Sequence, residues 1–386
     1  MRVLTIFLDM IRANRLSTFN DKVEDDTPID VVLKELGGTV YNNCFTPGAD
    51  TPRGISAYLT GIDPNKNGCN TRLKWPAHFI YGGTSNVFDL FNSMGYKNHV
   101  YASIKEQETG LFPFELMNTC TFNKNHKIDD FLSNITLENN HHLFVGVSDF
   151  HWAFDDFGYT RKGESQSYDI VSQVVSKIFD KFEKNDFDHI FIFSDHGFKF
   201  TSESYKADRR LLLNEDRTNV LMFHHIKGDK GLLTNNKLCS LSDMYATYQD
   251  ILGVSPKRDY SLLVPEQREY ILSEEHANFL PSVNQNIEMW SLVNNNHIYI
   301  RTLTSSMLIN RVDRSITEDM IGEYDELIKH GTSFGDYLDE YNKIFNYTMN
   351  IRNGYACFSD GSPRKRRSRY SVIKDVIFDK ISSIKS

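Results

Sequence analysis

The sequence lacks closely paired cysteines. Its five cysteines are spread singly over 386 residues, with no C-x-x-C pair among them. Disulfide frameworks and zinc ribbons are built from closely spaced pairs, so neither kind of scaffold is indicated. We therefore expect reduced thiols that pack as small hydrophobic residues, as is typical of a cytoplasmic protein.

Long hydrophobic runs are also missing. No run approaches the roughly 20 apolar residues that a membrane-spanning helix needs. The apolar stretch at 3–8 is interrupted at Thr5 and closed by Asp9, so it is too short for the core of a signal peptide. It is better interpreted as a buried parallel strand, and we predict a cytoplasmic location.

Positive charge is scarce outside the C-terminal end. The chain has 43 Lys and Arg against 51 Asp and Glu, a net charge of −8, which argues against general nucleic-acid binding. Residues 363–386 contain eight basic and two acidic residues, with isoleucines and valines at near-helical spacing. Such a tail can contact the inner face of an anionic membrane peripherally, or it can be a solvated or docked basic helix. The basic cluster at 364–369 lacks interleaved stacking aromatics apart from the adjacent Tyr370, so nucleic acid is not predicted as a partner.

Short apolar runs alternate with helical patterns along most of the chain. The runs at 3–8, 144–147, 190–193 and 220–223 are typical of buried strands, and the apolar stripes at 87–94 and 170–182 of helices. This alternation predicts an α/β fold with a mostly parallel central sheet flanked by helices on both faces.

The composition changes twice after the α/β part. We expect a catalytic domain at 1–265 and a smaller C-terminal α+β subdomain at 266–360. The subdomain includes a strand-like run at Ile298–Ile300 and charged helical stretches around 317–347. Residues 361–386 form the basic amphipathic tail.

Three groups of polar residues follow or lie between the predicted strands, where sites form in open α/β sheets. Asp9 ends the first strand, and Asp195-His196-Gly197 directly follows the run at 190–193. Adjacent Asp and His side chains on a tight turn can bind one cation, and Gly197 permits the backbone to bend.

The third group is Thr51-Pro52-Arg53. Pro52 suits the first position of a helix and Thr51 the N-cap before it, so the segment can simply be a well-capped helix. Alternatively, the hydroxyl of Thr51 lies in the positive potential of the helix N-terminus, where a metal ion could ionise it to a nucleophile. Arg53 could then bind an anionic group such as phosphate.

Taken in order, these segments resemble the alkaline phosphatase and sulfatase superfamily over about residues 3–253. The resemblance is carried by the following segments: Asp9, 38–53 running into Leu59-Thr60-Gly61, 86–97 with its Gly95-Tyr96, Ser194-Asp195-His196-Gly197, and 241–253. In sulfatases the nucleophile stands nine residues before a Thr-Gly pair, and here that position is Thr51. The resemblance implies an alkaline phosphatase-like sheet and a metal-dependent ester hydrolase or transferase.

The resemblance also implies a metal site. Its ligands would be Asp9, Thr51, Asp195 and His196, a set that suits Zn²⁺ or Mn²⁺ better than Ca²⁺. Calcium sulfatases often have a second Asp on the first strand, and here Met10 takes that position.

A second ion is also indicated by the resemblance. Asp149 and His151 are its candidate ligands, and His151 could instead contact the substrate. A further histidine would be needed, for which His276 is the first candidate and His225 the second. Lys199, three residues after His196, could contact a phosphate or sulfate group. One or two ions are therefore expected.

Threonine as the nucleophile separates this sequence from ordinary sulfatases. Those enzymes oxidise a Cys or Ser to formylglycine, and Thr51 cannot give that aldehyde. The resemblance therefore favours a phosphohydrolase or phospho-group transferase acting on a small-molecule, glycan-linked or lipid-linked phosphoester, with a role in the cell envelope. Two alternatives stay open: a sulfatase that uses Thr51 directly, and an inactive sulfatase-like binding protein. The oligomeric state is not predicted.

Overall fold

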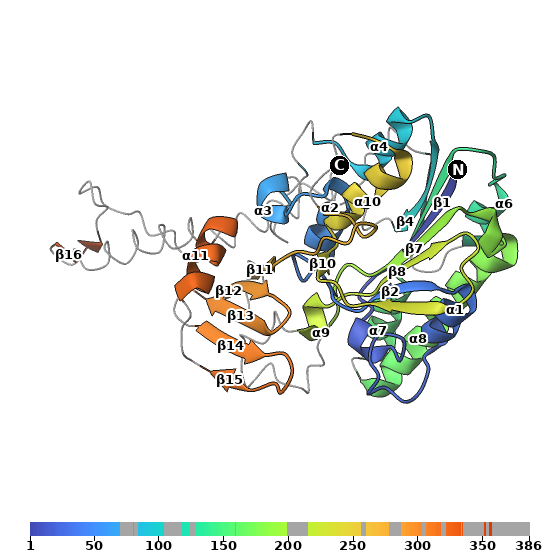
Figure 1. Cartoon of the computed structure of the whole chain (residues 1–386). Coiled ribbons are helices and arrows are strands. Elements are labelled where there is room, and N and C mark those ends of the chain that lie inside the picture. Colours follow the sequence, from blue (N-terminus) through green and yellow to red (C-terminus); the bar gives the residue numbers. More distant parts are fainter. Residues whose placement is uncertain are drawn as a thin grey trace. The chain divides into compact units, whose positions relative to one another are not determined.

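The structure is a computed structural model. It describes residues 1–69, 80, 84–103, 118–122, 128–158, 160–198, 215–255, 260–277, 287–302, 306–317, 322–332, 334, 351–352 and 355–356. The chain divides into two units, Met1–Thr332 and Ser333–Ser386. Apart from two short strands, every helix and strand with assigned bounds lies in the first unit (Figure 1).

An eight-stranded sheet forms the centre of the first unit. Its strands lie in the order β5 (Asn118–Phe122), β4 (Lys97–Ser103), β6 (His141–Val147), β1 (Arg2–Leu8), β7 (His189–Phe193), β8 (Met222–Ile226), β2 (Gly38–Tyr41) and β9 (Leu232–Asn235). All pairs are parallel except those that β8 makes with β7 and β2. The predicted mostly parallel sheet is confirmed, and the run at 220–223 leads into its single antiparallel strand.

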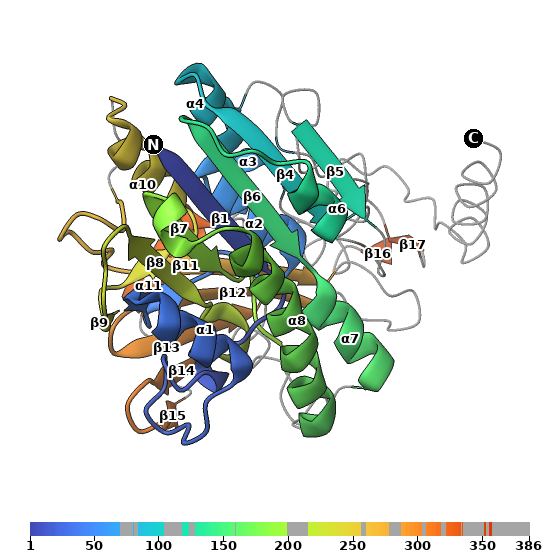
Figure 2. The ribbon, with the colours of Figure 1, turned by 90° about the vertical axis from the view of Figure 1, so that its right-hand side faces the viewer.

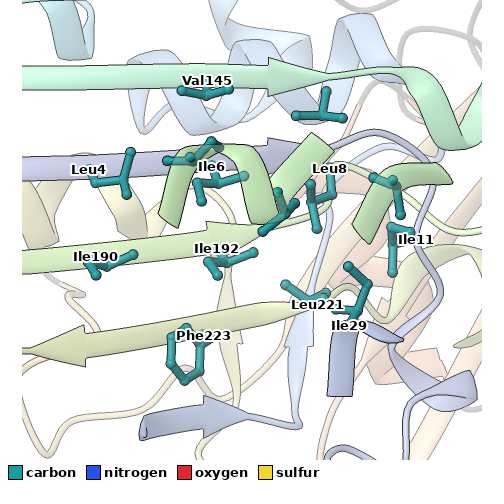
Figure 3. Close-up of a cluster of buried hydrophobic side chains, with 14 of the residues drawn as sticks. Leu4, Ile6, Leu8, Ile11, Ile29, Val145, Ile190, Ile192, Leu221 and Phe223 are labelled. Atoms are coloured by element: carbon teal, nitrogen blue, oxygen red, sulfur yellow. The ribbon is translucent and has the colours of Figure 1, made fainter. Parts of the chain in front are cut away.

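Strand β1 lies inside the sheet, between β6 and β7, and its residues alternate between the two faces. Leu4, Ile6 and Leu8 belong to one buried cluster, and Val3 and Phe7 belong to the other. Successive side chains of a strand point to opposite faces, so an almost continuous apolar run serves two cores. Figure 3 shows the first of these clusters, with side chains from several parallel strands packed together.

Helices cover both faces of the central sheet (Figure 2). The cluster with Leu4 also contains residues of α1 (Pro28–Leu36), α6 (Ile128–Ser133), α7 (Asp149–Phe157) and α8 (Arg161–Lys181). The cluster with Val3 contains residues of α2 (Thr51–Thr60), α4 (Val87–Ser93) and α10 (Asp243–Leu252). The predicted helices at 87–94 and 170–182 correspond to α4 and to the second half of α8.

Shorter elements connect these layers. They are η1 (Ala13–Arg15), β3 (Cys44–Phe45), α3 (Pro64–Asn67), η3 (Lys184–Asp186), α9 (Glu215–Thr218) and β10 (Cys239–Ser240). Strands β3 and β10 pair in parallel as a separate small ribbon. Because β3 comes just before α2 in the chain, this ribbon fixes the start of the segment that carries Thr51.

A second sheet follows the α/β part of the first unit. It is antiparallel, with β11 (Ile271–Ala277), β12 (Ile287–Val293), β13 (His297–Thr302), β14 (Ser306–Asn310) and β15 (Ile316–Thr317) in that order. Helix α11 (Gly322–Gly331) comes after it, and β13 confirms the predicted strand at 298–300. In the second unit, β16 (Ile351–Arg352) pairs with β17 (Tyr355–Ala356). The domain limits at 265 and 360 stay predictions.

Within the part of the chain that the structure describes, none of the helices has both the length and the apolar character needed to cross a bilayer. The basic tail predicted at 361–386 lies outside the described residues. Its predicted membrane contact therefore stays a prediction.

Candidate functional site

The site begins where two neighbouring strands end at the same edge of the sheet. Asp9 directly follows β1, and Asp195 comes two residues after β7. The Asp9 backbone N–H donates to the Val147 carbonyl (3.0 Å), which holds the chain at the end of β6. The Met10 N–H donates to Asp195 Oδ1 (3.1 Å). The parallel register thus brings two acids together from distant parts of the sequence.

Met10 gives this edge an unusual backbone turn. Its φ of 68° lies in the left-handed region, where a non-glycine residue costs about 1–3 kcal/mol. The strained conformation directs its N–H to Asp195, while its side chain is buried in the core. The turn therefore couples the positions of Asp9 and Asp195.

Helix α2 brings the threonine to the same edge. Its N-cap is Asp50, whose side chain accepts from the Arg53 N–H (3.1 Å), and Thr51 is its first residue. The prediction that Thr51 is the N-cap is wrong, because the preceding Asp is at least as good a capping residue. The Thr51 hydroxyl is consequently directed at the acids: Oγ1 lies 3.4 Å from His196 Nε2 and 3.5 Å from Asp9 Oδ1.

Gly54 lets α2 approach the turn after β7. A Cβ atom at Gly54 would lie 2.6 Å from the Asp195 carbonyl oxygen, closer than real Cβ atoms come to other atoms. Only glycine permits this distance between the first turn of α2 and Asp195. The spacing between Thr51 and the acids therefore depends on the absence of a Cβ atom at position 54.

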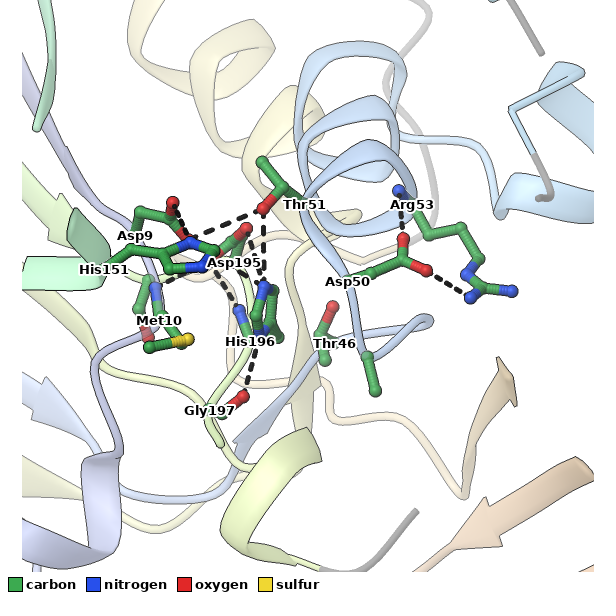
Figure 4. A network of polar contacts seen from close by, with 12 residues as sticks. Asp9, Met10, Thr46, Asp50, Thr51, Arg53, His151, Asp195, His196 and Gly197 are labelled. Atoms are coloured by element: carbon green, nitrogen blue, oxygen red, sulfur yellow. Dashed lines mark hydrogen bonds and ion pairs between the residues drawn. The ribbon is translucent and has the colours of Figure 1, made fainter. Parts of the chain in front are cut away.

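Asp9, Asp195 and His196 form the centre of the site (Figure 4). One ligand atom from each lies within 4.8 Å of the others, and all three residues are buried. The His196 Nδ1–H donates to the Gly197 carbonyl (2.6 Å), which leaves the Nε2 lone pair directed at the acids. Nε2 lies 3.8 Å from Asp9 Oδ1 and 3.5 Å from Asp195 Oδ2. Three electron-rich atoms therefore converge on one point.

This convergence is electrostatically unfavourable without a cation. Burial, with Asp9 nearby, raises the pKa of Asp195 to about 6 although His196 opposes the shift. Among the described residues, the buried Asp195 Oδ2 accepts no hydrogen bond. Two carboxylates, an imidazole and a hydroxyl are ligands suited to Zn²⁺ or Mn²⁺. The residues present therefore fit the divalent ion that the sequence predicts.

His151 adjoins the cluster from a third element. It lies in the first turn of α7, and its Nδ1 is 3.1 Å from Asp9 Oδ2. The side chain is 23% exposed, in contrast to the buried acid that it contacts. A ring bonded to Asp9 and reaching solvent can orient that acid or exchange a proton with a bound molecule.

Arg53 forms ion pairs with acids outside the cluster around Thr51. Its guanidinium is buried and ion-paired with Asp50, and Nη2 also lies 3.6 Å from Glu275 Oε1. Figure 4 shows the Arg53 side chain directed away from the acids around Thr51. A guanidinium held between two buried acids supports the structure, and the predicted anion-binding role of Arg53 stays a prediction.

The remaining predicted residues have different outcomes. Asp149 begins α7, where burial raises its pKa to about 6, but it is not part of the three-residue cluster. His276 lies in β11 with its side chain outside the described part, and Lys199 lies wholly outside it. His225 is buried in β8 and donates from Nδ1 to the Gly37 carbonyl (2.8 Å). The second ion stays a prediction.

Sequence reasoning missed Asp50 and Glu275. Asp50 is visible in the sequence as a capping residue just before Pro52, but Thr51 is an equally plausible cap there. Glu275 stands beside Glu274 in a strand-like run, and no local spacing relates it to Arg53. Its partner could be found only from the fold.

Comparisons with known proteins give a clear result for the fold. No protein-family model matches the chain, and no curated protein sequence matches it. A 2-O GAG sulfatase is 13% identical with a TM-score of 0.68, and the alignment covers 89% of this chain and 93% of that one.

Two other solved structures lead to the same fold. A phosphonate monoester hydrolase from Silicibacter pomeroyi is 11% identical with a TM-score of 0.60, covering 95% of this chain and 99% of that one. A protein in the alkaline phosphatase superfamily from Vibrio parahaemolyticus is 13% identical with a TM-score of 0.62, covering 88% and 87%. This chain therefore has the fold of the alkaline phosphatase superfamily, as the resemblance in its sequence predicts.

Proposed function

We propose that this protein is a metal-dependent, sulfatase-like ester hydrolase that uses Thr51 as its nucleophile on a phosphoester. One observation carries the proposal: the Thr51 hydroxyl lies within 3.5 Å of both Asp9 Oδ1 and His196 Nε2 at the edge of the sheet. A threonine that served only as the first residue of a helix would have no need of buried acids and an oriented imidazole beside its oxygen.

The four side chains Asp9, Thr51, Asp195 and His196 would hold the metal. A bound Zn²⁺ or Mn²⁺ would supply Lewis-acid charge, which would lower the pKa of the threonine hydroxyl and neutralise the converging acids. The hydrogen bond from His196 Nδ1 to the Gly197 carbonyl fixes the imidazole in the tautomer that binds through Nε2. Asp9 and Asp195 are both held by backbone contacts, so little reorganisation accompanies binding.

The reaction would proceed by two in-line displacements. In the first, the Thr51 hydroxyl gives its proton to solvent, Oγ1 forms a bond to phosphorus as the ester P–O bond breaks, and the leaving oxygen takes a proton. In the second, water or an acceptor hydroxyl attacks phosphorus as the Oγ1–P bond breaks, and the proton that the attacking oxygen loses restores the Thr51 hydroxyl. The N-terminus of α2 provides backbone N–H groups and a positive dipole beside the charge that develops.

His151 is the candidate for proton transfer to the leaving oxygen. Its Nδ1 is bonded to Asp9 and its ring is partly exposed, so it can exchange protons with both solvent and substrate. The same bond to Asp9 would stabilise the protonated ring.

Sulfate esters are a second candidate class of substrate. Several solved structures with this fold are named as sulfatases, including the 2-O GAG sulfatase and a putative sulfatase from Bacteroides thetaiotaomicron. Thr51 would then attack sulfur directly, because it cannot be converted to formylglycine. An inactive binding protein is a third outcome that the experiment below separates.

The physiological substrate is proposed only by class. We keep glycan-linked or lipid-linked phosphoesters of the cell envelope as the proposed substrates, with transfer to a sugar hydroxyl as an alternative to hydrolysis. Contact with the inner membrane face through residues 363–386 would bring the enzyme to such substrates.

The test is a side-by-side assay of Zn²⁺-loaded protein on an aryl phosphodiester, an aryl phosphonate monoester and an aryl sulfate. Thr51→Ala should lower turnover by about 10³-fold or more, as expected for loss of a nucleophile. Thr51→Ser keeps the hydroxyl and should retain measurable turnover, with metal content measured in each variant. Equal rates for Thr51→Ala and wild type would refute the proposed nucleophile, and metal-bound wild type without turnover would favour the binding protein.

A further inference from the structure

Strand β11 of the second sheet runs along the segment that leads to Thr51. The Ser273 hydroxyl donates to the Thr46 carbonyl (2.6 Å), and the Glu274 N–H donates to the Pro47 carbonyl (3.1 Å). Glu274 also forms a parallel β-bridge with Gly48. Consecutive residues of β11 therefore contact consecutive residues of the segment before α2.

Glu275 continues this series with charge. Its Oε1 lies 3.6 Å from Arg53 Nη2, and its Oε2 lies 3.6 Å from Arg217 Nη2. Arg217 Nη2 also donates to the Ala49 carbonyl (2.6 Å). The Glu275 carboxylate therefore lies between two guanidiniums. Arg217 contacts the backbone before Thr51, and Arg53 belongs to the helix turn after it.

These contacts enclose Thr51 along the chain. Ala49, held by Arg217, is two residues before Thr51, and Arg53 is two residues after it. The carboxylate and both guanidiniums are largely buried, so the removal of one partner leaves charge without compensation in a region of low dielectric. A shift of either guanidinium would move the backbone on one side of Thr51.

We propose that Glu275 is a positioning residue for Thr51, which it holds against the Asp9 and His196 side chains by acting through Arg53 and Arg217. The inference rests on the proposed function for the role of Thr51. In Figure 4 the Thr51 side chain points to the acids, whereas the Arg53 side chain points away from them, toward Asp50. The second sheet would thus take part in setting the geometry of the site.

The test compares two buried acids of equal exposure. The side chains of Glu275 and Glu164 are each 3% exposed. Glu164 lies on α8 and forms an ion pair with Arg15 of η1 (3.3 Å). Zn²⁺ affinity is measured by competition with a fluorescent chelator, and turnover is measured on the aryl esters. Glu275→Gln should weaken Zn²⁺ binding and lower kcat, each by about 10-fold or more, as for other outer partners of metal ligands.

A split between kcat and KM distinguishes positioning from general destabilisation. KM for Glu275→Gln should stay within about threefold of wild type, since the change affects the nucleophile and not substrate contacts. Glu164→Gln should keep wild-type Zn²⁺ affinity and kcat even where its melting temperature falls. Wild-type Zn²⁺ affinity and kcat in Glu275→Gln would overturn the proposal.

Two further arms keep the result decisive. If wild type binds Zn²⁺ but turns over none of the esters, the proposed function fails and the Zn²⁺ affinities alone decide the role of Glu275. If Glu275→Gln does not fold, Glu275→Asp and Ser273→Ala replace it, since they keep the charge or remove a single hydrogen bond. Either variant should then bind Zn²⁺ severalfold more weakly than Glu164→Gln, and wild-type affinity in both would overturn the proposal.

Discussion

Strand β1 carries two buried polar clusters, one around Thr5 in its middle and one around Asp9 just past its end. In the first, the His142 Nδ1–H donates to Asn98 Oδ1 (2.9 Å), and Thr5 Oγ1 lies 3.3 Å from His142 Nε2. Thr5 Oγ1 is also 2.8 Å from the Tyr248 hydroxyl, which is 3.2 Å from that of Tyr58. When His142 is neutral, each donor in this series of hydrogen bonds has an acceptor.

The second cluster has the opposite balance. Around Asp9 and Asp195, the carboxylate oxygens and the Nε2 of His196 outnumber the hydrogen-bond donors that the described residues place beside them. Both clusters are buried and both join β1 to neighbouring strands. A closed network stabilises one fold, whereas a surplus of acceptors requires an external cation and is typical of a functional site.

The largest effect should come from adding a hydrogen-bond donor to the cluster around Asp9 and Asp195. In Asp195→Asn the amide can donate to His196 Nε2 in place of a second negative charge. We expect turnover to fall by more than the roughly 100-fold seen when an outer partner of a metal ligand is lost. The metal-free protein should instead be more stable by about 1–3 kcal/mol, because a buried unsatisfied oxygen is relieved. Urea unfolding with and without Zn²⁺ measures both, and lower stability of the metal-free variant would contradict the comparison.

Acid should destabilise the fold at two buried histidines, His142 in the closed network and His224 on β8. Burial lowers the pKa values of His142 and His224 to about 3, from an ordinary value of 6.5. Between these values the unfolded chain binds protons that the folded chain does not, so stability is complete above pH 6.5 and is lost as pH falls toward 3. At pH 5 each histidine should reduce the free energy of unfolding by about 2 kcal/mol.

Urea unfolding at pH 7.5 and pH 5 measures this loss. The matched variant is His224→Phe, whose ring can keep the stacking on Phe191 (centroids 4.2 Å apart) without a titratable group. The loss between the two pH values should be smaller by about 2 kcal/mol in this variant, the contribution of one histidine. An unchanged loss would mean that other groups determine the acid sensitivity.

A smaller effect is expected when one hydroxyl is removed from the closed network around Thr5. Thr5→Val keeps the shape of the side chain but removes the hydroxyl between His142 and Tyr248. Stability should fall by about 1–3 kcal/mol, since buried polar groups lose a partner. The kcat at a permissive temperature should stay near that of wild type, and a large fall in kcat without a fall in stability would break the distinction between the clusters.

The smallest effect on the protein itself should come from removal of the tail. Deletion of 363–386 should leave stability and turnover of a soluble ester unchanged, which separates localisation from chemistry. Co-sedimentation with anionic vesicles should fall severalfold, since each basic residue near such a surface contributes about 1 kcal/mol. Neutral vesicles are the control, and unchanged binding to anionic vesicles would remove the proposed membrane contact.

The sequence predicts the strands and the central acids because both follow from local patterns. Apolar runs mark β1 and β7, and Asp9 and Asp195 follow those runs directly, so a parallel sheet brings them to one edge. The antiparallel direction of β8 is not visible, since an apolar run has the same composition in either direction.

Ion-pair and hydrogen-bond partners that meet only through tertiary packing cannot be predicted from local sequence patterns. Arg53 looks like an anion ligand in the sequence because Thr51 is as plausible a cap as Asp50, and no nearby residue reveals Glu275 as the partner of Arg53. His142 likewise gives no sign of the neutral, fully bonded state that Thr5 and Asn98 impose on it. Both depend on which elements pack together, and that is decided by the whole fold.

The close approach at Gly54 has a consequence for engineering. The separation between the threonine oxygen and the turn after β7 is set by a position where even one methyl group would collide with backbone. A library that randomises the first turn of α2 should therefore return glycine at 54 in nearly every clone that keeps turnover. Clones selected only for folding should accept alanine there, with the helix displaced, so the two selections would separate the demands of catalysis from those of the scaffold.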